Sequence, residues 1–235
     1  MNAVKQKLSY YFGDRAFYAK ALSVAVPIMI QNGITNFVNL LDNIIVVGAG
    51  GTEPMSAVAS VNKLIFVYNL CLFGGCAGVG ILTAQFYGKG DYDGVQKSFR
   101  LKLYTNLCLL AAALTVLITA GPTLIELFLH EGSETGDLAK TFEYAKEYLS
   151  VILIGIIPQA ATEAYSSTLR ETEHTTLPMK AGIAAIVTNL SLNYVLIFGH
   201  FGAPALGVRG AAIATVIAKF VELSVIMLTV RLKDT

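Results

Sequence analysis

Residues 181–198 read AGIAAIVTNLSLNYVLIF, a run with few polar side chains and no charged one. A transmembrane helix needs about 20 mainly apolar residues to cross the hydrocarbon core of a bilayer, and this run falls within the tolerated range. Five further runs of the same kind occur, at residues 21–47, 57–86, 103–129, 147–169 and 210–230. The sequence therefore predicts an all-α membrane protein in which six transmembrane helices form one domain, residues 21–230.

The composition agrees with a chain that is solvated mainly by lipid. Of the 235 residues, 54% are apolar and 14% are charged, whereas a soluble domain carries about 25% charged residues. The formal net charge of +1 indicates no nucleic-acid partner. No catalytic motif of hydrolases, kinases or metalloproteases is present, so we expect a protein that is not an enzyme and that binds no cofactor.

Lysine and arginine residues in the predicted loops are distributed unequally. Twelve of them, Lys102 included, fall on the side of the N-terminus and three on the opposite side. Since basic residues favour the cytoplasmic side of a membrane, both termini are predicted to be cytoplasmic, in the plasma membrane. Residues 1–20 are predicted to form an interfacial segment on that side, and residues 231–235 to form its cytoplasmic end.

Prolines and glycines inside the apolar runs give local predictions. Pro27, Pro122 and Pro158 lie within predicted helices, where we expect each to kink or locally break the backbone. The glycine-rich stretch GGCAGVG at residues 74–80 lacks the ending of a phosphate-binding loop. We interpret it as close helix packing through Gly74 and Gly78.

Polar side chains recur at helical spacing inside the runs, which places them on one face of each predicted helix. Two interpretations compete: hydrogen bonds that hold helices together, or a water-accessible cavity between the helices that admits a substrate. Lys219 and Glu222 are three residues apart and are expected to neutralise each other. The residues predicted to line a substrate cavity are Asn32, Thr35, Asn39, Lys63, Asn69, Gln159 and Glu163.

Asp42 is the most informative of the polar residues. An intramembrane carboxylate is a functional group by default and can carry a proton or bind Na⁺. In the predicted arrangement Asn189, Asn193, Thr215 and Lys63 lie in the middle or outer half of the bilayer, so we expect them to converge with Asp42 at one depth, where the carboxylate can bind a cation beside amide and hydroxyl oxygens. A structural ion pair between Asp42 and Lys63 is the alternative. No other metal site is predicted.

Four motifs together resemble the MATE family (multidrug and toxic compound extrusion). The first two are NLLDNIIVVG at residues 39–48 and QFYGKGD at residues 85–91. The third pairs Leu169-Arg170 with the Leu177-Pro178-Met179 segment that follows. The fourth is NLSLNYVLIFG at residues 189–199, which runs on to FGAPALGVRGAAIAT at residues 201–215.

The resemblance implies one six-helix lobe of a secondary transporter that exports organic, often cationic compounds by antiport against H⁺ or Na⁺. It also implies a cation site at Asp42, Asn189 and Thr215, with Asn193 where many relatives have an acid. The expected partners are small organic substrates, the lipid bilayer and a second six-helix lobe, from the same native chain or from a parallel partner subunit.

Two alternatives to this function remain open. One is a lipid-linked oligosaccharide flippase of the same wider superfamily, which should present more cationic residues to its cavity. The other is a non-transporting, truncated membrane subunit.

Overall fold

The computed structural model describes the backbone of residues 15–50, 52–132, 137–202 and 204–232, and the side chains of these residues except 35–50, 52, 130–132 and 201. Every long element in these ranges is a helix. In chain order they are α2 (Arg15–Gly50), α3 (Thr52–Gly88), α4 (Tyr92–Thr119), α5 (Gly121–Gly132), α6 (Leu138–Glu171), α7 (Thr176–Phe198), the short 3₁₀ helix η1 (His200–Gly202) and α8 (Gly207–Leu232).

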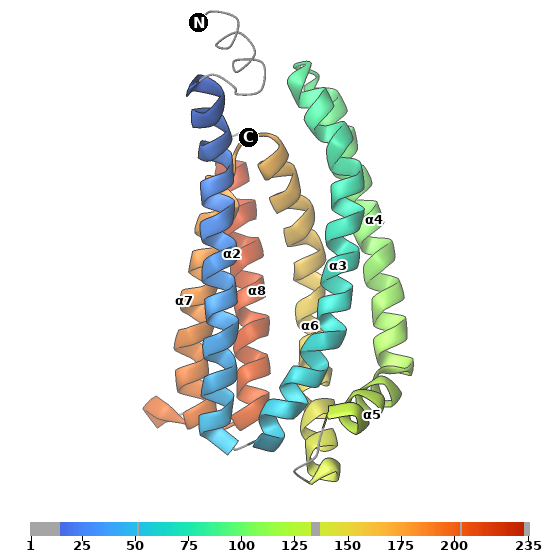
Figure 1. Cartoon of the computed structure of the whole chain (residues 1–235), viewed down its shortest axis with the longest axis vertical. Helices are drawn as coiled ribbons and strands as arrows, with labels where there is room; N and C mark the ends of the chain where they lie inside the picture. Colours follow the sequence, from blue (N-terminus) through green and yellow to red (C-terminus); the bar gives the residue numbers. More distant parts are fainter. Residues whose placement is uncertain (1–14, 51, 133–136, 203, 233–235) are drawn as a thin grey trace, which may run out of the picture.

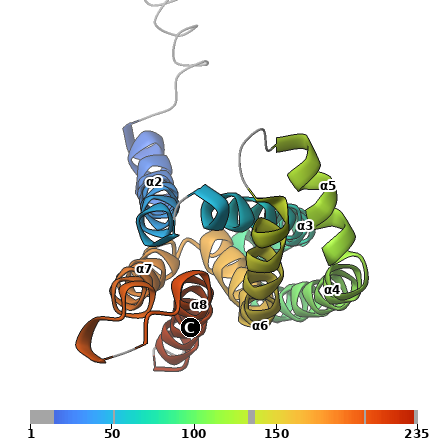
Figure 2. The same ribbon diagram turned by 90° about the horizontal axis from the view of Figure 1, so that it is seen from below.

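The long helices run alternately up and down, and α5 is a short helix that joins α4 to α6 (Figure 1). They form two groups, with α2, α7 and α8 on one side and α3, α4 and α6 on the other (Figure 2). Helix α6 joins the groups, since it packs against α3, α4 and α8. Helix α2 begins and α8 ends at the same end of the bundle, which we call the terminal end.

Helices α3, α4, α6, α7 and α8 are long and apolar enough to cross a membrane. Large apolar side chains such as Phe66, Leu107 and Ile118 are exposed on the outside of the bundle, as lipid contact requires. The first predicted span, residues 21–47, lies in α2, whose side chains from residue 35 onward are outside the described residues. The sixth membrane crossing therefore stays a prediction.

The predicted third span is interrupted in the structure. Helix α4 begins at Tyr92 and ends at Thr119, and α5 starts a new direction at Gly121. The break lies directly before Pro122, whose ring cannot fit against the preceding turn, so the expected break is confirmed there. Residues 103–129 therefore belong to two helices, separated at the break that Pro122 predicts. Helices α2 and α6 continue through Pro27 and Pro158.

Polar caps and glycines position the other helix ends. The Asp91 side chain accepts a hydrogen bond of 2.9 Å from the Gly94 amide at the start of α4. Gly199 adopts the left-handed conformation, with φ at 74°, and ends α7. A Cβ on Gly210 would lie 2.7 Å from the Leu196 carbonyl oxygen, so a glycine is needed where α8 approaches α7.

The prediction for the glycine-rich stretch of α3 was wrong. Gly74 and Gly78 have no heavy atom of the described chain near their Cβ positions. Instead, a Cβ on Gly75 would lie 3.3 Å from the Thr105 side chain of α4, and a Cβ on Gly80 would collide with the carboxylate of a glutamate on α6. The glycines that permit close approach are therefore the neighbours of the two predicted ones.

Candidate functional site

Three of the four predicted cation-coupling residues contact one another on α7 and α8. The Asn193 amide donates to the Asn189 side-chain oxygen at 3.0 Å. The Asn189 amide in turn donates to the Thr215 hydroxyl at 3.2 Å, and that hydroxyl donates to the Ala211 carbonyl at 3.0 Å. Asn189 and Asn193 are buried. The chain of hydrogen bonds places amide and hydroxyl oxygens side by side, which is the chemistry that a small hard cation requires.

The fourth residue, Asp42, lies on α2, and its side chain is outside the described residues. Helix α2 packs against α7 and, over fewer residues, against α8 (Figure 2). Thr35 and Asn39 are also on the part of α2 whose side chains are not described. Asn32 is exposed, whereas its neighbour Gln31 donates a 3.4 Å hydrogen bond to the Pro178 carbonyl of α7.

The remaining predicted cavity residues do not gather at one place. The Gln159 amide of α6 donates to the Asn69 side chain of α3, a hydrogen bond between helices of the kind expected for interhelical packing. The exposed Lys63 ammonium lies 5.4 Å from the ring centre of Phe128 in α5. Glu163 lies further along α6, toward the terminal end.

Two of the ion pairs within single helices involve residues singled out in the sequence. Lys219 and Glu222 of α8 are 3.6 Å apart, so the predicted neutralisation is confirmed. Glu163 and Arg170 of α6 are separated by 3.5 Å, and each side chain is 25% exposed. Sequence reasoning had left Glu163 without a counter-ion, because seven residues separate it from Arg170.

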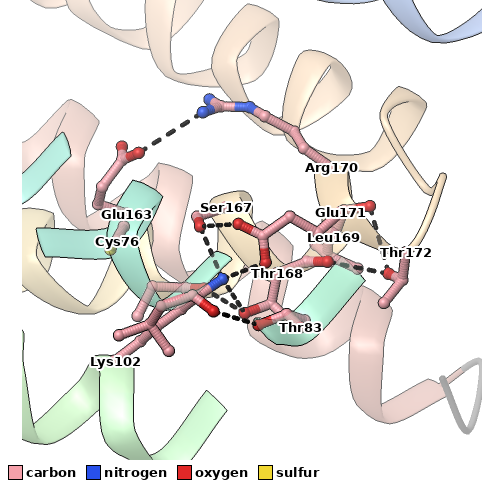
Figure 3. Close-up of polar contacts among 12 residues, drawn as sticks. Cys76, Thr83, Lys102, Glu163, Ser167, Thr168, Leu169, Arg170, Glu171 and Thr172 are labelled. Carbon is pink, nitrogen blue, oxygen red and sulfur yellow. Dashed lines mark hydrogen bonds and ion pairs between the residues drawn. The ribbon is translucent and has the colours of Figure 1, made fainter. Parts of the chain in front are cut away.

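The polar network around Lys102 was not predicted from the sequence. Lys102 was counted as a loop charge, but it lies inside α4 with an exposure of 0%, which corrects that assignment. Its ammonium donates to the Ser167 hydroxyl at 2.8 Å, to the Thr168 hydroxyl at 3.3 Å and to the Glu171 carboxylate (Figure 3). Ser167 also donates to the second Glu171 oxygen at 2.8 Å. One turn of α6 therefore supplies a hydrogen-bond acceptor for each of the three N–H groups of the ammonium.

A sequence signal for this network does exist. Ser98, Lys102 and Asn106 follow one another at steps of four, and all three are buried on the same face of α4. Asn106 donates to the Ala160 carbonyl of α6 at 2.9 Å and to the Cys76 sulfur of α3 at 3.3 Å. The polar residues of this face have the same helical spacing as those of the other predicted helices. They were not recognised because the predicted helix began at residue 103, which excluded Ser98 and Lys102.

Two cavities flank α6 near the terminal end. One, of about 210 Å³, lies between α3 and α6 and is charged; its lining residues are Phe73, Cys76, Ala77, Glu163, Ser167, Arg170 and Glu171. The other, of about 380 Å³, is lined mainly by aromatic and apolar side chains of α3, α4, α6 and α8, among them Tyr87, Phe99 and Tyr165. Within the described ranges, no three His, Cys, Asp or Glu side chains are placed to hold a metal ion.

A protein-family model described as MatE matches residues 27–195, well over half of the chain. The chain belongs to the MATE family. Relatives of this MATE-family chain include the "Probable multidrug resistance protein NorM" of Thermotoga maritima, 30% identical over 204 residues that cover 85% of this chain and 41% of the relative. Multidrug resistance protein PmpM of Pseudomonas aeruginosa is 28% identical, over 92% of this chain and 43% of its own length.

Solved structures agree with the MATE fold. A multidrug resistance MATE family transporter in an outward-facing conformation superposes with a TM-score of 0.73 and 26% identity, over 92% of this chain and 45% of that one. A MOP superfamily transporter from Pyrococcus furiosus gives a TM-score of 0.84 at 16% identity, over 96% of this chain and 48% of that one. The chain thus spans about half the length of these transporters.

The MATE assignment confirms two predictions. The chain is a multi-pass membrane protein with the lobe fold of these transporters, and its relatives are transporters rather than enzymes.

Proposed function

We propose that this chain is one lobe of a cation-coupled antiporter that exports small organic compounds, often cationic, across the plasma membrane. The observation that carries the proposal is the buried hydrogen-bonded chain of Asn193, Asn189 and Thr215. It lies on α7 and α8, and both of these helices contact α2, the helix that bears Asp42. The multidrug resistance relatives support export as the direction of transport.

The Asp42 carboxylate would bind the coupling ion, H⁺ or Na⁺, together with the amide and hydroxyl oxygens of the other three residues. No cofactor takes part. A cation that binds one conformation of the lobe more tightly than the other shifts the population toward it. Exchange of the cation for substrate then requires that the substrate prefer the opposite conformation. Asn193 stands where many relatives have an acid. Asp42 is therefore the only one of the four residues whose side chain can change its charge when the coupling ion binds.

A second lobe completes the transporter in this proposal. The chain spans about half of its relatives, so the second lobe comes from the same native chain or from a parallel subunit. Removing Lys102 from the twelve loop cations leaves eleven, against three on the opposite side, which still favours cytoplasmic termini. The terminal end of the bundle therefore faces the cytoplasm.

Efflux of a fluorescent dye from proteoliposomes tests the coupling role. The full-length protein is reconstituted, and efflux is driven in turn by a proton gradient and by a sodium gradient. We expect Asp42→Asn to abolish the gradient-driven component, because the amide neither ionises nor holds a cation by charge. Asp93→Asn makes the same chemical change at an exposed position of α4 and is expected to retain it. Undiminished coupled efflux in the Asp42 variant would refute the proposed role.

A further inference from the structure

The charged cavity between α3 and α6 is lined by two carboxylates and one guanidinium, and a buried ammonium behind the lining balances the second carboxylate. Glu163 and Arg170 form one pair on α6, and Glu171 is paired with the buried Lys102 behind it (Figure 3). Helix α8 adds the Lys219–Glu222 pair at longer range, also without net charge. Helix α3 contributes no charged side chain to the lining, only Phe73, Cys76 and Ala77. A cavity of this balance favours neither a net cation nor a net anion.

The two pairs differ in how completely they are satisfied. The Lys102 ammonium has three oxygen acceptors, and the Glu171 carboxylate is held by Lys102 and Ser167 while 18% of its side chain stays exposed. Glu171 thus faces the cavity in a fixed position, and it has room to do so because residue 80 opposite it is glycine.

Arg170, by contrast, has an unused donor. Its Nε is fully enclosed and has no acceptor among the described residues, although a guanidinium at the end of the same side chain reaches Glu163. A buried N–H without an acceptor is destabilising, and each such group in a native protein requires an explanation, which a bound ligand, ion or water can supply. An acceptor oxygen on a ligand would supply that partner, by a small shift of the side chain.

We propose that this cavity binds a small zwitterion, with its ammonium on the carboxylates of Glu163 and Glu171 and its carboxylate or other acceptor on Arg170. The two poles must be close together on the ligand, because the Glu163 and Arg170 charges are 3.5 Å apart. The cavity of about 210 Å³ has the volume of about seven waters in the liquid, which suits a molecule of amino-acid size. This proposal rests on the proposed function, since it names a substrate class for a site at the cytoplasmic end.

Protection of a cysteine introduced at Ala77 from thiol modification tests the site without any transport. Ala77 lines the cavity and is exposed, so a bound ligand shields the thiol of the Ala77→Cys variant from disulfide formation with methyl methanethiosulfonate. In the full-length protein the native cysteines, including Cys71, Cys76 and Cys108, are replaced by serine. Three probes share a branched carbon skeleton: leucine carries both charges, 3-methylbutylamine only the positive one and 4-methylpentanoate only the negative one. We expect leucine to protect at a concentration at least tenfold lower than either analogue.

Two variants should shift this selectivity in opposite directions. Arg170→Met is expected to remove the preference for leucine over the amine, and Glu163→Gln to weaken its preference over the acid. A misfolded protein cannot produce both shifts. Lys97→Met removes a positive charge from the exposed face of α4, where it pairs with Asp93, and should leave all three probes unchanged. Leucine protecting no better than the amine, or an unaltered preference in the Arg170 variant, would overturn the proposal.

A different measurement tests the proposed function. Dye efflux from proteoliposomes is recorded for the same preparations. Absent efflux with an intact leucine preference would remove the transport role and leave the binding site in place. Intact efflux without a leucine preference would remove the zwitterion site alone.

Discussion

The Lys102–Glu171 pair gives the sharpest prediction for stability. Replacing Glu171 by Gln leaves an ammonium that is 0% exposed without its counter-charge. Breaking one side of a buried pair costs about 3–5 kcal/mol. We expect about 3 kcal/mol for Glu171→Gln, the lower end of that range, because the amide oxygen still accepts a hydrogen bond.

The reverse substitution should cost less. Lys102→Met leaves the Glu171 carboxylate with the Ser167 hydroxyl and with 18% of its side chain in contact with solvent. We therefore expect a loss of about 2 kcal/mol. The double variant removes both charges and should also lose about 2 kcal/mol, so the two sites are coupled by about 3 kcal/mol, near the upper limit for residues in contact.

The measurement is a double-mutant cycle on the full-length protein in mixed micelles. Unfolding is driven by increasing the SDS fraction and is followed by circular dichroism, which reports the loss of helix. Lys97→Met is the matched control, since its pair with Asp93 is 72% and 75% exposed and should contribute nothing measurable. If the two single losses simply add in the double variant, the pair is not energetically coupled and the reasoning is wrong.

Two further predictions follow from packing and hydrogen bonding. Gly80→Ala should destabilise the protein, because its Cβ would collide with the Glu171 carboxylate. Gly78→Ala should leave the stability unchanged, because its Cβ would face open space. The thermal unfolding temperatures of the two variants are compared. Tyr68→Phe should cost about 1 kcal/mol in the same SDS titration, because the buried Tyr68 hydroxyl donates to the Ile156 carbonyl at 3.1 Å, and an unchanged midpoint would contradict this.

Apolar runs were sufficient to predict most of the fold. The runs at 147–169, 181–198 and 210–230 each fall within one helix of the structure. Helix ends were less predictable, because a membrane helix continues past the hydrocarbon core into polar sequence. Helix α4 begins at Tyr92 for this reason, with Lys97 and Arg100 in its first turns, and those charges had suggested a loop.

The candidate site was predictable only where its partners share a helix or a motif. Asn189 and Asn193 are four residues apart, so their contact follows from helical spacing alone. The contact between Lys102 and Glu171 joins residues 69 apart in sequence, and no local pattern connects them. The orphaned Nε of Arg170 depends on side-chain packing, which no periodicity reveals.

The burial of Lys102 has a consequence for the order in which the lobe is made. During synthesis α4 emerges before α6, so the lysine meets the bilayer before Glu171 exists. A lysine at the centre of a membrane helix costs roughly 2.5–3.5 kcal/mol during insertion, and Lys102 lies about 15 Å from the start of α4 at 1.5 Å per residue. Its long side chain can reach the headgroups in the meantime. Helix α4 can therefore insert first with this ammonium at the headgroups, and the ammonium gains its three acceptor oxygens when α6 packs against α4.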